Sequence, residues 1–157
     1  MSRLQDLLEY ERRFWGHGLS VAGIDESGRG PLAGPVLAAA VVLPEGVCID
    51  GADDSKQLSK EMREHLYSLI LGSARAVGVG AASVKEIDRR NILRATTVAM
   101  QRALDHLQEV PGHIVIDGLY VKHLGREHEA VVDGDALIHS ISCASIVAKV
   151  IRDRLMR

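Results

Sequence analysis

The apolar run "PVLAAAVVLP", residues 35–44, is the feature that most constrains how this chain can fold. It contains no polar residue, it is bounded by prolines, and it is rich in valine. It is also too short for most helices, so its length and composition are typical of a buried strand. Residues 35–44 therefore predict a central strand of a sheet.

Shorter apolar runs predict the other strands, and periodic stripes predict the helices. The predicted strands are residues 21–25, 35–44, 74–83, 113–118 and 129–135. The first predicted helix is residues 3–14, and the last is the chain from about residue 141. A second helix begins after the cap residue Ser59 and has an apolar face made of Met62, Leu66, Leu69 and Ile70. A capping box at Ser83 and Glu86 opens further helix, with an apolar stripe that includes Leu93, Thr96, Met100 and Ala103. Three early strands, followed by strands that alternate with helices, predict an α/β fold with a mixed sheet.

Length and composition limit the number of domains and the kind of core. A chain of 157 residues is long enough for one domain with a proper core and too short for two ordinary ones. Apolar residues make up 46% and charged residues 25%, as is usual for a soluble globular protein. Because the chain has only 1 Trp, 3 Tyr and 1 Phe, its core must be aliphatic. We expect residues 1–157 to form a single domain.

The charge balance gives no support for a nucleic-acid partner. The formal net charge is −2, whereas nucleic-acid-binding domains are usually basic. Cations do crowd the C-terminal stretch, which contains Lys149, Arg152 and Arg154, and such a run predicts a solvated helix face. Asp153 follows Lys149 by four residues, which predicts an ion pair within that helix.

The two cysteines and the hydropathy pattern indicate a compartment. Cys48 and Cys143 lie far apart without CxxC spacing, which indicates buried thiols in a reducing compartment rather than a disulfide or a zinc site. The N-terminal stretch lacks the apolar core of a signal peptide, and no run approaches the ~18 apolar residues of a membrane span. These features predict a cytoplasmic protein.

Four acids follow short apolar runs. Asp25 and Glu26, Asp117, and Asp135 each lie beside a glycine at the end of a predicted strand. Ligand sites of open α/β sheets lie outside the carboxyl ends of the strands, so we expect these acids to converge. Converging carboxylates repel one another unless a cation such as Mg²⁺ or Mn²⁺ joins them. Two such ions ~4 Å apart can activate water and stabilise the leaving oxygen in phosphodiester cleavage.

Several simpler interpretations of the acids stay open. A single acid at a strand end is often a turn former or a solvated charge. Consecutive strand residues point to opposite faces, so Asp25 and Glu26 can share a site only if the strand ends or bends there. Asp133 is a rival to Asp135 as the fourth ligand, because alternation would place both on one face if the strand continued that far.

The glycines after the first acids have two interpretations. Gly28, Gly30 and Ala33 match the dinucleotide-binding pattern G-x-G-x-x-A. Acids directly precede the glycines, where they would repel a pyrophosphate, and the chain continues as a strand rather than as the required helix. The better interpretation is a flexible loop that approaches a sugar-phosphate chain closely, with Arg29 contacting phosphate.

Five blocks resemble a known family. They are "GIDESGRGPLAGPV", "DDSKQLS", "EIDRRNILRATTVAM", "VIDG" and "GDALIHSISCASIVAKVIRDRLM". In this order they resemble the blocks of bacterial ribonuclease HII, the type 2 ribonuclease H, from about residue 21 to the last residue. The resemblance implies an RNase H-like fold with a central mixed sheet of about five strands flanked by helices. It also implies a catalytic metal site for Mg²⁺ or Mn²⁺ at Asp25, Glu26, Asp117 and Asp135.

The resemblance implies a substrate and its contacts. The family hydrolyses the RNA strand of RNA–DNA hybrids and cuts 5′ of a single ribonucleotide embedded in duplex DNA. Gly28, Arg29 and Gly30 are similar to the family loop that reads the 2′-hydroxyl, the group that separates RNA from DNA locally. Lys56 resembles a backbone-phosphate contact. We therefore expect a monomer that binds hybrid and ribonucleotide-containing duplexes and no membrane.

The chain differs from the family at its C-terminus. Members usually continue for several dozen residues beyond the position of Arg157, through a segment with a tyrosine that takes part in recognising the ribonucleotide junction. The expectation is therefore a C-terminally truncated catalytic domain with impaired junction recognition. The alternatives are a catalytically silent nucleic-acid-binding fragment and another nuclease or transferase of the same fold.

Two residues near the fourth acid carry separate predictions. His139 could touch metal or a leaving group, although a surface histidine at a helix start is the commoner case. Cys143 stands where alanine is commoner in the family, and it predicts a small core residue rather than a reactive thiol.

Overall fold

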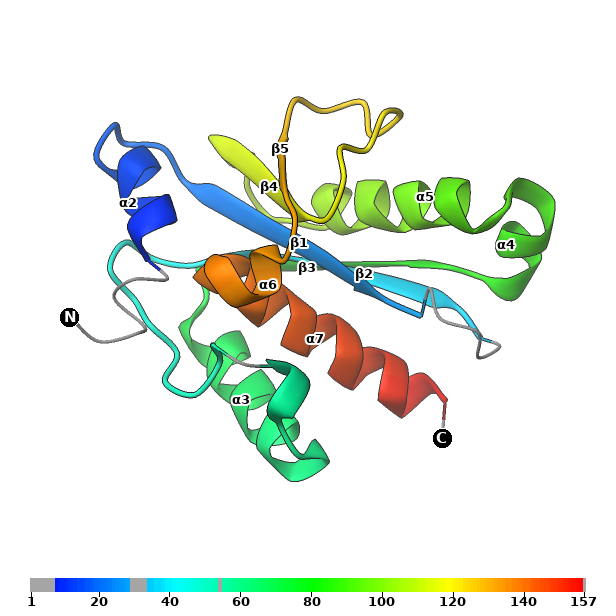
Figure 1. Ribbon diagram of the computed structural model, residues 1–157, viewed down its shortest axis with the longest axis horizontal. Coiled ribbons are helices and arrows are strands. Elements are labelled where there is room, and N and C mark those ends of the chain that lie inside the picture. Colours follow the sequence, from blue (N-terminus) through cyan, green and yellow to red (C-terminus); the bar gives the residue numbers. More distant parts are fainter. Residues whose placement is uncertain (1–7, 29–33, 54, 157) are drawn as a thin grey trace.

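The computed structural model describes residues 8–28, 34–53 and 55–156, and its centre is a five-stranded sheet (Figure 1). The strands are β1 (Val21–Ser27), β2 (Val36–Val42), β3 (Ala76–Ala82), β4 (His113–Asp117) and β5 (Glu129–Val131). They are ordered β3-β2-β1-β4-β5. The β1–β2 and β2–β3 pairs are antiparallel, whereas β1–β4 and β4–β5 are parallel. The predicted mixed α/β sheet and the central position of residues 35–44 are confirmed.

Helices cover both faces of the sheet. They are α2 (Glu9–Trp15), α3 (Lys60–Ser73), α4 (Val84–Arg90), α5 (Ile92–Asp105), α6 (Gly134–Leu137) and α7 (His139–Leu155), with a 3-10 turn, η1, at Ser55–Gln57. Figure 1 shows α5 on one side of the sheet and α3 with α7 on the other. Two aliphatic clusters fill the spaces between these layers, as the scarcity of aromatic residues predicts. Among the described residues no helix is long and apolar enough to cross a membrane.

Glycines allow two helices to approach the sheet closely. On β3, a β-carbon at Gly80 would overlap the backbone oxygen of Ala99 in α5. On β1, a β-carbon at Gly23 would lie 2.5 Å from the backbone nitrogen of Ile141 in α7. These glycines weaken the strands locally, but they permit the close packing that fixes α5 and α7 on the sheet.

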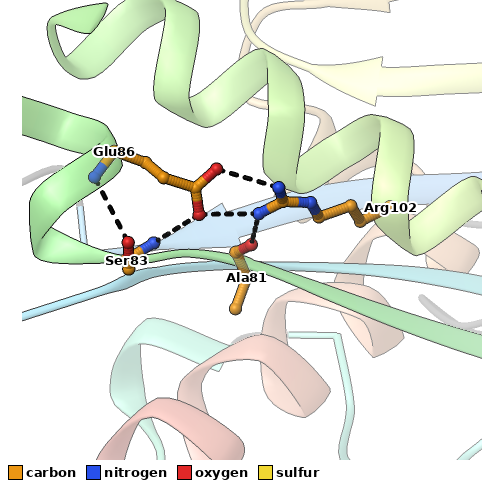
Figure 2. Close-up of polar contacts among 4 residues, drawn as sticks. All are labelled: Ala81, Ser83, Glu86 and Arg102. Atoms are coloured by element: carbon orange, nitrogen blue, oxygen red, sulfur yellow. Dashed lines mark hydrogen bonds and ion pairs between the residues drawn. The ribbon is translucent and has the colours of Figure 1, made fainter. Parts of the chain in front are cut away.

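The capping box predicted at Ser83 joins three elements (Figure 2). The Ser83 hydroxyl accepts a hydrogen bond from the Glu86 amide, and the Glu86 carboxylate accepts one from the Ser83 amide. Arg102 of α5 donates to both oxygens of Glu86 at 2.8 Å and to the Ala81 carbonyl at 2.7 Å. The Arg102 hydrogen bonds lower the pKa of Glu86 to about 2. The start of α4 is thereby held against β3 and α5.

The structure corrects the predicted end of the first strand. β1 continues in register through Ser27, with Asp25 opposite Ala39 and Glu26 opposite Ala38. The prediction that the strand ends or bends at the two acids is therefore wrong. The reason is that β2 continues alongside as far as Leu37 and keeps the ladder paired.

The predicted strand over residues 129–135 is also too long. β5 ends at Val131, and Asp133 has a φ of 59°, in the left-handed region, which turns the chain. Asp135 therefore lies in the short helix α6 instead of at a strand end. The alternation argument that made Asp133 a rival of Asp135 fails for the same reason.

Smaller differences concern the helices. The described part of the N-terminal helix is Glu9–Trp15, and residues 3–7 of the predicted helix lie outside the described residues. α7 begins at His139 rather than near residue 141. Leu66 and Ile70 are buried as predicted. Three other side chains predicted to face the core are exposed, because fewer positions of α3 and α5 are buried than their apolar patterns predict. These are Met62, Leu69 and Leu93.

Candidate metal centre

Three of the four predicted acids meet at one end of the sheet. Asp25, Asp117 and Asp135 each offer one carboxylate oxygen, and these oxygens all lie within 4.8 Å of one another. Asp25 and Asp135 are each only 6% exposed. We call these three residues the acid cluster.

Two adjacent parallel strands position the first two members of the acid cluster. β1 carries Asp25, and β4 carries Asp117 as its last residue. Side chains alternate along a strand, and Gly23 of β1 faces α7. Asp25, two residues later, therefore also faces α7. Val115 of β4 packs with Ile141 at the start of α7. Asp117 lies two residues after Val115, so its side chain points to the α7 side of the sheet as well.

A helical turn supplies the third member. Asp135 lies in the first turn of α6, directly after Gly134. A β-carbon at Gly134 would lie 2.8 Å from the end of the Ile141 side chain and 3.5 Å from Asp117 Oδ1, so a larger residue there would require the Ile141 side chain to shift. The Ser142 hydroxyl of α7 donates a hydrogen bond to the Asp135 carbonyl and so holds this turn against α7. Asp135 thus reaches the cluster by a route that the sequence pattern did not predict.

Glu26 stands beside the acid cluster rather than inside it. Glu26 is paired with Ala38, which packs on the α5 side of the sheet. Because side chains alternate along β1 without a break, Glu26 faces the α5 side, whereas Asp25 faces α7. It still borders the same recess as Asp25, Asp117 and Asp135. Its amide also donates to Asp25 Oδ1 at 2.8 Å. The role of Glu26 as a metal ligand stays a prediction.

Burial and mutual repulsion make the acid cluster electrostatically costly. Burial raises the pKa of Asp25 well above its usual value, and the charges of Glu26 and Asp117 raise it further. Burial also raises the pKa of Asp117, with a further rise from Asp135, while backbone hydrogen bonds from Gly134 and Asp135 oppose these effects. Carboxyl groups perturbed in this way by burial and by like charges are typical of functional sites.

The oxygens of the acid cluster fit a hard divalent cation. Among the described residues, neither Asp117 Oδ1 nor Asp135 Oδ1 has a hydrogen-bond partner, although both atoms are buried. Among the described residues, the Lys56 ammonium lies 3.6 Å from Asp135 Oδ2, and that side chain is 73% exposed. Carboxylate oxygens are the ligands that Mg²⁺ and Mn²⁺ prefer. The recess above them, about 380 Å³ in volume, also has Arg63 and Lys149 in its wall.

Of the predicted substrate-contacting residues that the structure describes, Lys56 lines this recess and Gly28 directly follows Ser27, which also lines it. Lys56 borders it, and its role as a phosphate contact stays a prediction. Gly28 has a φ of 107°, a conformation that favours glycine. Arg29 and Gly30 lie outside the described residues.

Arg152 was missed as a functional candidate. It is only 6% exposed, and its Nε donates to the Pro35 carbonyl at 3.1 Å. A β-carbon at Gly28 would lie 2.5 Å from that Nε, and one at Gly34 would lie 3.2 Å from Nη2. Arg152 thus packs against both ends of the glycine-rich segment. The prediction of a solvated helix face holds for Lys149 and Arg154 but is wrong for Arg152.

The remaining predictions near the site have clear outcomes. His139 is fully buried and its Nε2 accepts a hydrogen bond from the Ile49 amide at 2.8 Å, so the prediction of a surface histidine is wrong. Asp133 is not part of the acid cluster. Cys143 is a free, buried core residue and Lys149 pairs with Asp153 at 3.1 Å, as predicted.

Comparison with known proteins gives one consistent result. The family model described as Ribonuclease HII matches residues 22–157. The chain is 54% identical over 137 residues to ribonuclease HII of Geobacter metallireducens, covering 87% of this chain and 64% of that protein. It is 46% identical over 158 residues to ribonuclease HII of Acetivibrio thermocellus, covering 100% of this chain and 62% of that protein. The chain thus spans less than two thirds of the length of these relatives.

The fold is also similar to solved structures. The crystal structure of the ribonuclease H2 from Pyrococcus horikoshii OT3 superimposes with a TM-score of 0.77 and 32% sequence identity. The match covers 88% of this chain and 74% of that chain. The predicted RNase H-like fold is confirmed by this similarity and by the mixed five-stranded sheet.

Proposed function

The chain belongs to the ribonuclease HII family, and on that premise we propose that it is a metal-dependent endoribonuclease. The proposed reactions are hydrolysis of the RNA strand of RNA–DNA hybrids and cleavage 5′ of ribonucleotides embedded in duplex DNA. The observation that carries the proposal is the acid cluster, whose buried oxygens Asp117 Oδ1 and Asp135 Oδ1 have no partner among the described residues.

The acid cluster would hold the cation. Asp25, Asp117 and Asp135 converge from β1, β4 and α6, and Glu26 is the proposed fourth ligand from the rim of the recess. Two bound Mg²⁺ or Mn²⁺ ions would supply an activated water and stabilise the leaving oxygen. The four carboxylates would orient these ions, and the rigid pairing of β1 with β4 favours a constant separation between Asp25 and Asp117.

Cationic and glycine residues around the recess would place the substrate. Lys56 can reach a phosphate from the rim, because its ammonium is mostly exposed and lies next to Asp135. Gly28, Arg29 and Gly30 are proposed to contact the ribose that carries the 2′-hydroxyl. The left-handed φ of Gly28 supports this role, since a chain bent there without a side chain can approach a sugar closely.

We also propose that residues 1–157 form one catalytic domain that acts as a monomer in the cytoplasm. The single sheet with helices on both faces, which forms one continuous packed body in the described residues, supports the single domain.

Cleavage of three duplexes tests the proposed function. The substrates are an RNA–DNA hybrid, a DNA duplex with one ribonucleotide, and a matched all-DNA duplex, each with Mg²⁺, with Mn²⁺ and with a chelator. We expect metal-dependent cutting of the first two and none of the third. Asp117→Asn should abolish cutting. Asp133→Asn is a matched control that should retain it, because Asn also tolerates the left-handed φ at this position.

Two outcomes would contradict the proposal. Binding of the hybrid without cleavage by the wild-type chain would favour a nucleic-acid-binding protein of the same fold. Equal cutting of the all-DNA duplex would favour a nuclease that does not read the ribose.

A further inference from the structure

A second recess adjoins the acid cluster at Asp117. It has a volume of about 580 Å³ and lies between the first turns of α5 and the loop that follows β4. Asp117, the last residue of β4, borders both recesses, so the two are neighbours. We call this second recess the α5 groove.

The loop that forms one wall of the α5 groove is braced by a histidine. His128 Nε2 accepts a hydrogen bond from the Val121 amide at 3.0 Å. Nδ1 must then carry the proton, and it lies 2.8 Å from the Arg126 carbonyl, to which it donates. Both nitrogens of the ring are therefore fixed by the backbone of its own loop.

The same loop is also fixed to α5. The side-chain amide of Gln101 donates to the carbonyls of His123 and Leu124, each at 3.1 Å. Leu124 is only 2% exposed and belongs to the core under α5. The loop therefore has a defined shape, and the side chains that it exposes are held in place.

This braced loop exposes apolar and aromatic surface next to the acid cluster. Leu119 is 80% exposed and Tyr120 is 65% exposed. The Tyr120 ring stacks on His128, with centroids 4.2 Å apart and planes at 11°. One ring face is thus supported by a fixed histidine, and the exposure of the residue leaves the other available. A supported, exposed aromatic ring is a suitable platform for a sugar or a base.

Cations stand at the edges of the same groove. Arg94 of α5 and Lys122 of the loop both border it, and both are exposed. Neither forms an ion pair with another residue of the ranges 8–28, 34–53 and 55–156. Asp117 is the only carboxylate among the residues that line the groove, and it belongs to the acid cluster.

We propose that the α5 groove binds a nucleic-acid strand that continues from the phosphodiester held at the acid cluster. Arg94 and Lys122 contact its phosphates, and Tyr120 with Leu119 contacts its sugars or bases. This inference rests on the proposed function, because it takes the acid cluster as the place where the strand is cut. The shared border at Asp117 and the two cations favour a nucleic acid over a protein segment or a small apolar ligand, for which unpaired cations have no evident purpose.

Salt-dependent binding tests the groove without relying on cleavage. Affinity for a labelled RNA–DNA hybrid is measured between about 50 and 200 mM salt, in the presence of a chelator, for Arg94→Ala and for Lys122→Ala. The logarithm of the binding constant falls linearly with the logarithm of the salt concentration. Each lost phosphate contact should reduce the magnitude of that slope by about 0.9, the value expected per neutralised phosphate. The matched control is Arg75→Ala, a partly exposed cation beside β3 at the opposite edge of the sheet, which should leave the slope unchanged.

Tyr120 provides an independent arm of the test. Tyr120→Ala should weaken hybrid binding on the order of tenfold without a change in the salt slope, because stacking is lost and charge is not. Tyr120→Phe keeps the ring and should bind as the wild type does. All these side chains are exposed, so the variants should keep the wild-type thermal stability.

The outcomes separate this inference from the proposed function. If wild-type chain cleaves and binds the hybrid but all groove variants match Arg75→Ala, the groove does not bind the substrate and has another occupant, while the proposed function stands. If the wild type neither binds nor cuts the hybrid, both proposals are wrong.

Discussion

At the scale of single residues, the candidate site consists of carboxylates whose charges oppose folding unless a cation joins them. Asp25 is a buried example, and its raised pKa reflects burial first and the nearby charges of Glu26 and Asp117 second. Removing one charge from such a cluster relieves repulsion, whereas removing one ligand weakens the hold on a cation. Stability and metal binding should therefore change in opposite directions.

The variant Asp25→Asn tests this opposition. Without metal at neutral pH, its free energy of unfolding should equal that of the wild type or exceed it by about 1 kcal/mol. The wild type should gain stability as Mg²⁺ or Mn²⁺ is added, by about 2.7 kcal/mol at a metal concentration 100 times the Kd. Asp25→Asn should lose most of that gain and all cleavage. Thermal melts with and without metal measure both effects, and an undiminished metal-induced gain in the variant would remove Asp25 from the ligands.

Arg152 is expected to act through the ends of the glycine-rich segment. Its Nε donates a hydrogen bond to the Pro35 carbonyl, and its side chain packs on Gly28 and Gly34. Arg152→Met should raise KM for a ribonucleotide-containing duplex on the order of tenfold, since small misplacements of substrate-contacting groups are costly. Metal-induced stabilisation should stay as in the wild type. Arg152→Lys, which keeps the charge, should have a KM between those of the wild type and Arg152→Met. Lower stability with an unchanged KM would mean that Arg152 only supports the fold.

At the scale of helices and strands, two contacts decide how the layers fit together. The first joins α2 to the start of α7, where Ile138 provides no side-chain cap. Glu11 of α2 supplies the acceptor instead, because its Oε2 accepts a hydrogen bond from the Ser140 amide at 3.1 Å. Glu11 is only 1% exposed, and burial raises its pKa from 4.5 to about 7.

The raised pKa of Glu11 predicts a pH-dependent stability. Between about pH 4.5 and 7 the folded chain holds the Glu11 proton more tightly than the unfolded chain does, so the contribution of Glu11 to stability falls as the pH rises. Glu11→Gln removes this titration and keeps an acceptor. Relative to the wild type, the variant should therefore become more stable between pH 5 and pH 8, by on the order of 2 kcal/mol. Denaturant unfolding at several pH values measures the difference, and a constant difference would contradict the assignment.

The second contact is the close approach of α5 to β3. Gly80→Ala should destabilise the protein by about 1–3 kcal/mol or more, because the new methyl group would overlap the Ala99 backbone, which cannot move aside. Gly72→Ala in α3 is the matched control. No atom lies within 4 Å of a β-carbon there, and alanine favours the helix, so it should stabilise by up to about 1 kcal/mol. Thermal unfolding of both variants checks the pair, and similar stabilities would refute the close packing.

The elements differ in how far sequence could predict them. The apolar run at residues 35–44 identified β2 because a strand buried on both faces leaves that pattern. Asp25 and Asp117 could be placed together because β1 and β4 are parallel neighbours whose ends coincide. Asp135 joins the cluster as predicted, but its place in a helical turn could not be predicted, since it depends on the left-handed conformation of Asp133, a residue that is not glycine. The burial of His139 and Arg152 depends on segments distant in the sequence, so local patterns could not predict it.

At the scale of the whole molecule, one sheet organises both the stability and the site. Its two faces are covered by α5 and by α3 with α7, and these layers hold the ends of β1 and β4 in register (Figure 1). The acid cluster lies at that end and lines the recess bordered by Lys56, and Asp117 also borders the α5 groove.

The most direct test of this account is the location of bound manganese by anomalous diffraction from crystals of the whole chain grown with Mn²⁺. The account predicts a peak within about 2.5 Å of carboxylate oxygens from Asp25, Asp117 and Asp135. It also predicts the loss of that peak in Asp25→Asn crystals. A chain that binds Mn²⁺ only elsewhere, or that shows no peak between these three carboxylates at a concentration that saturates cleavage, would contradict the central claim.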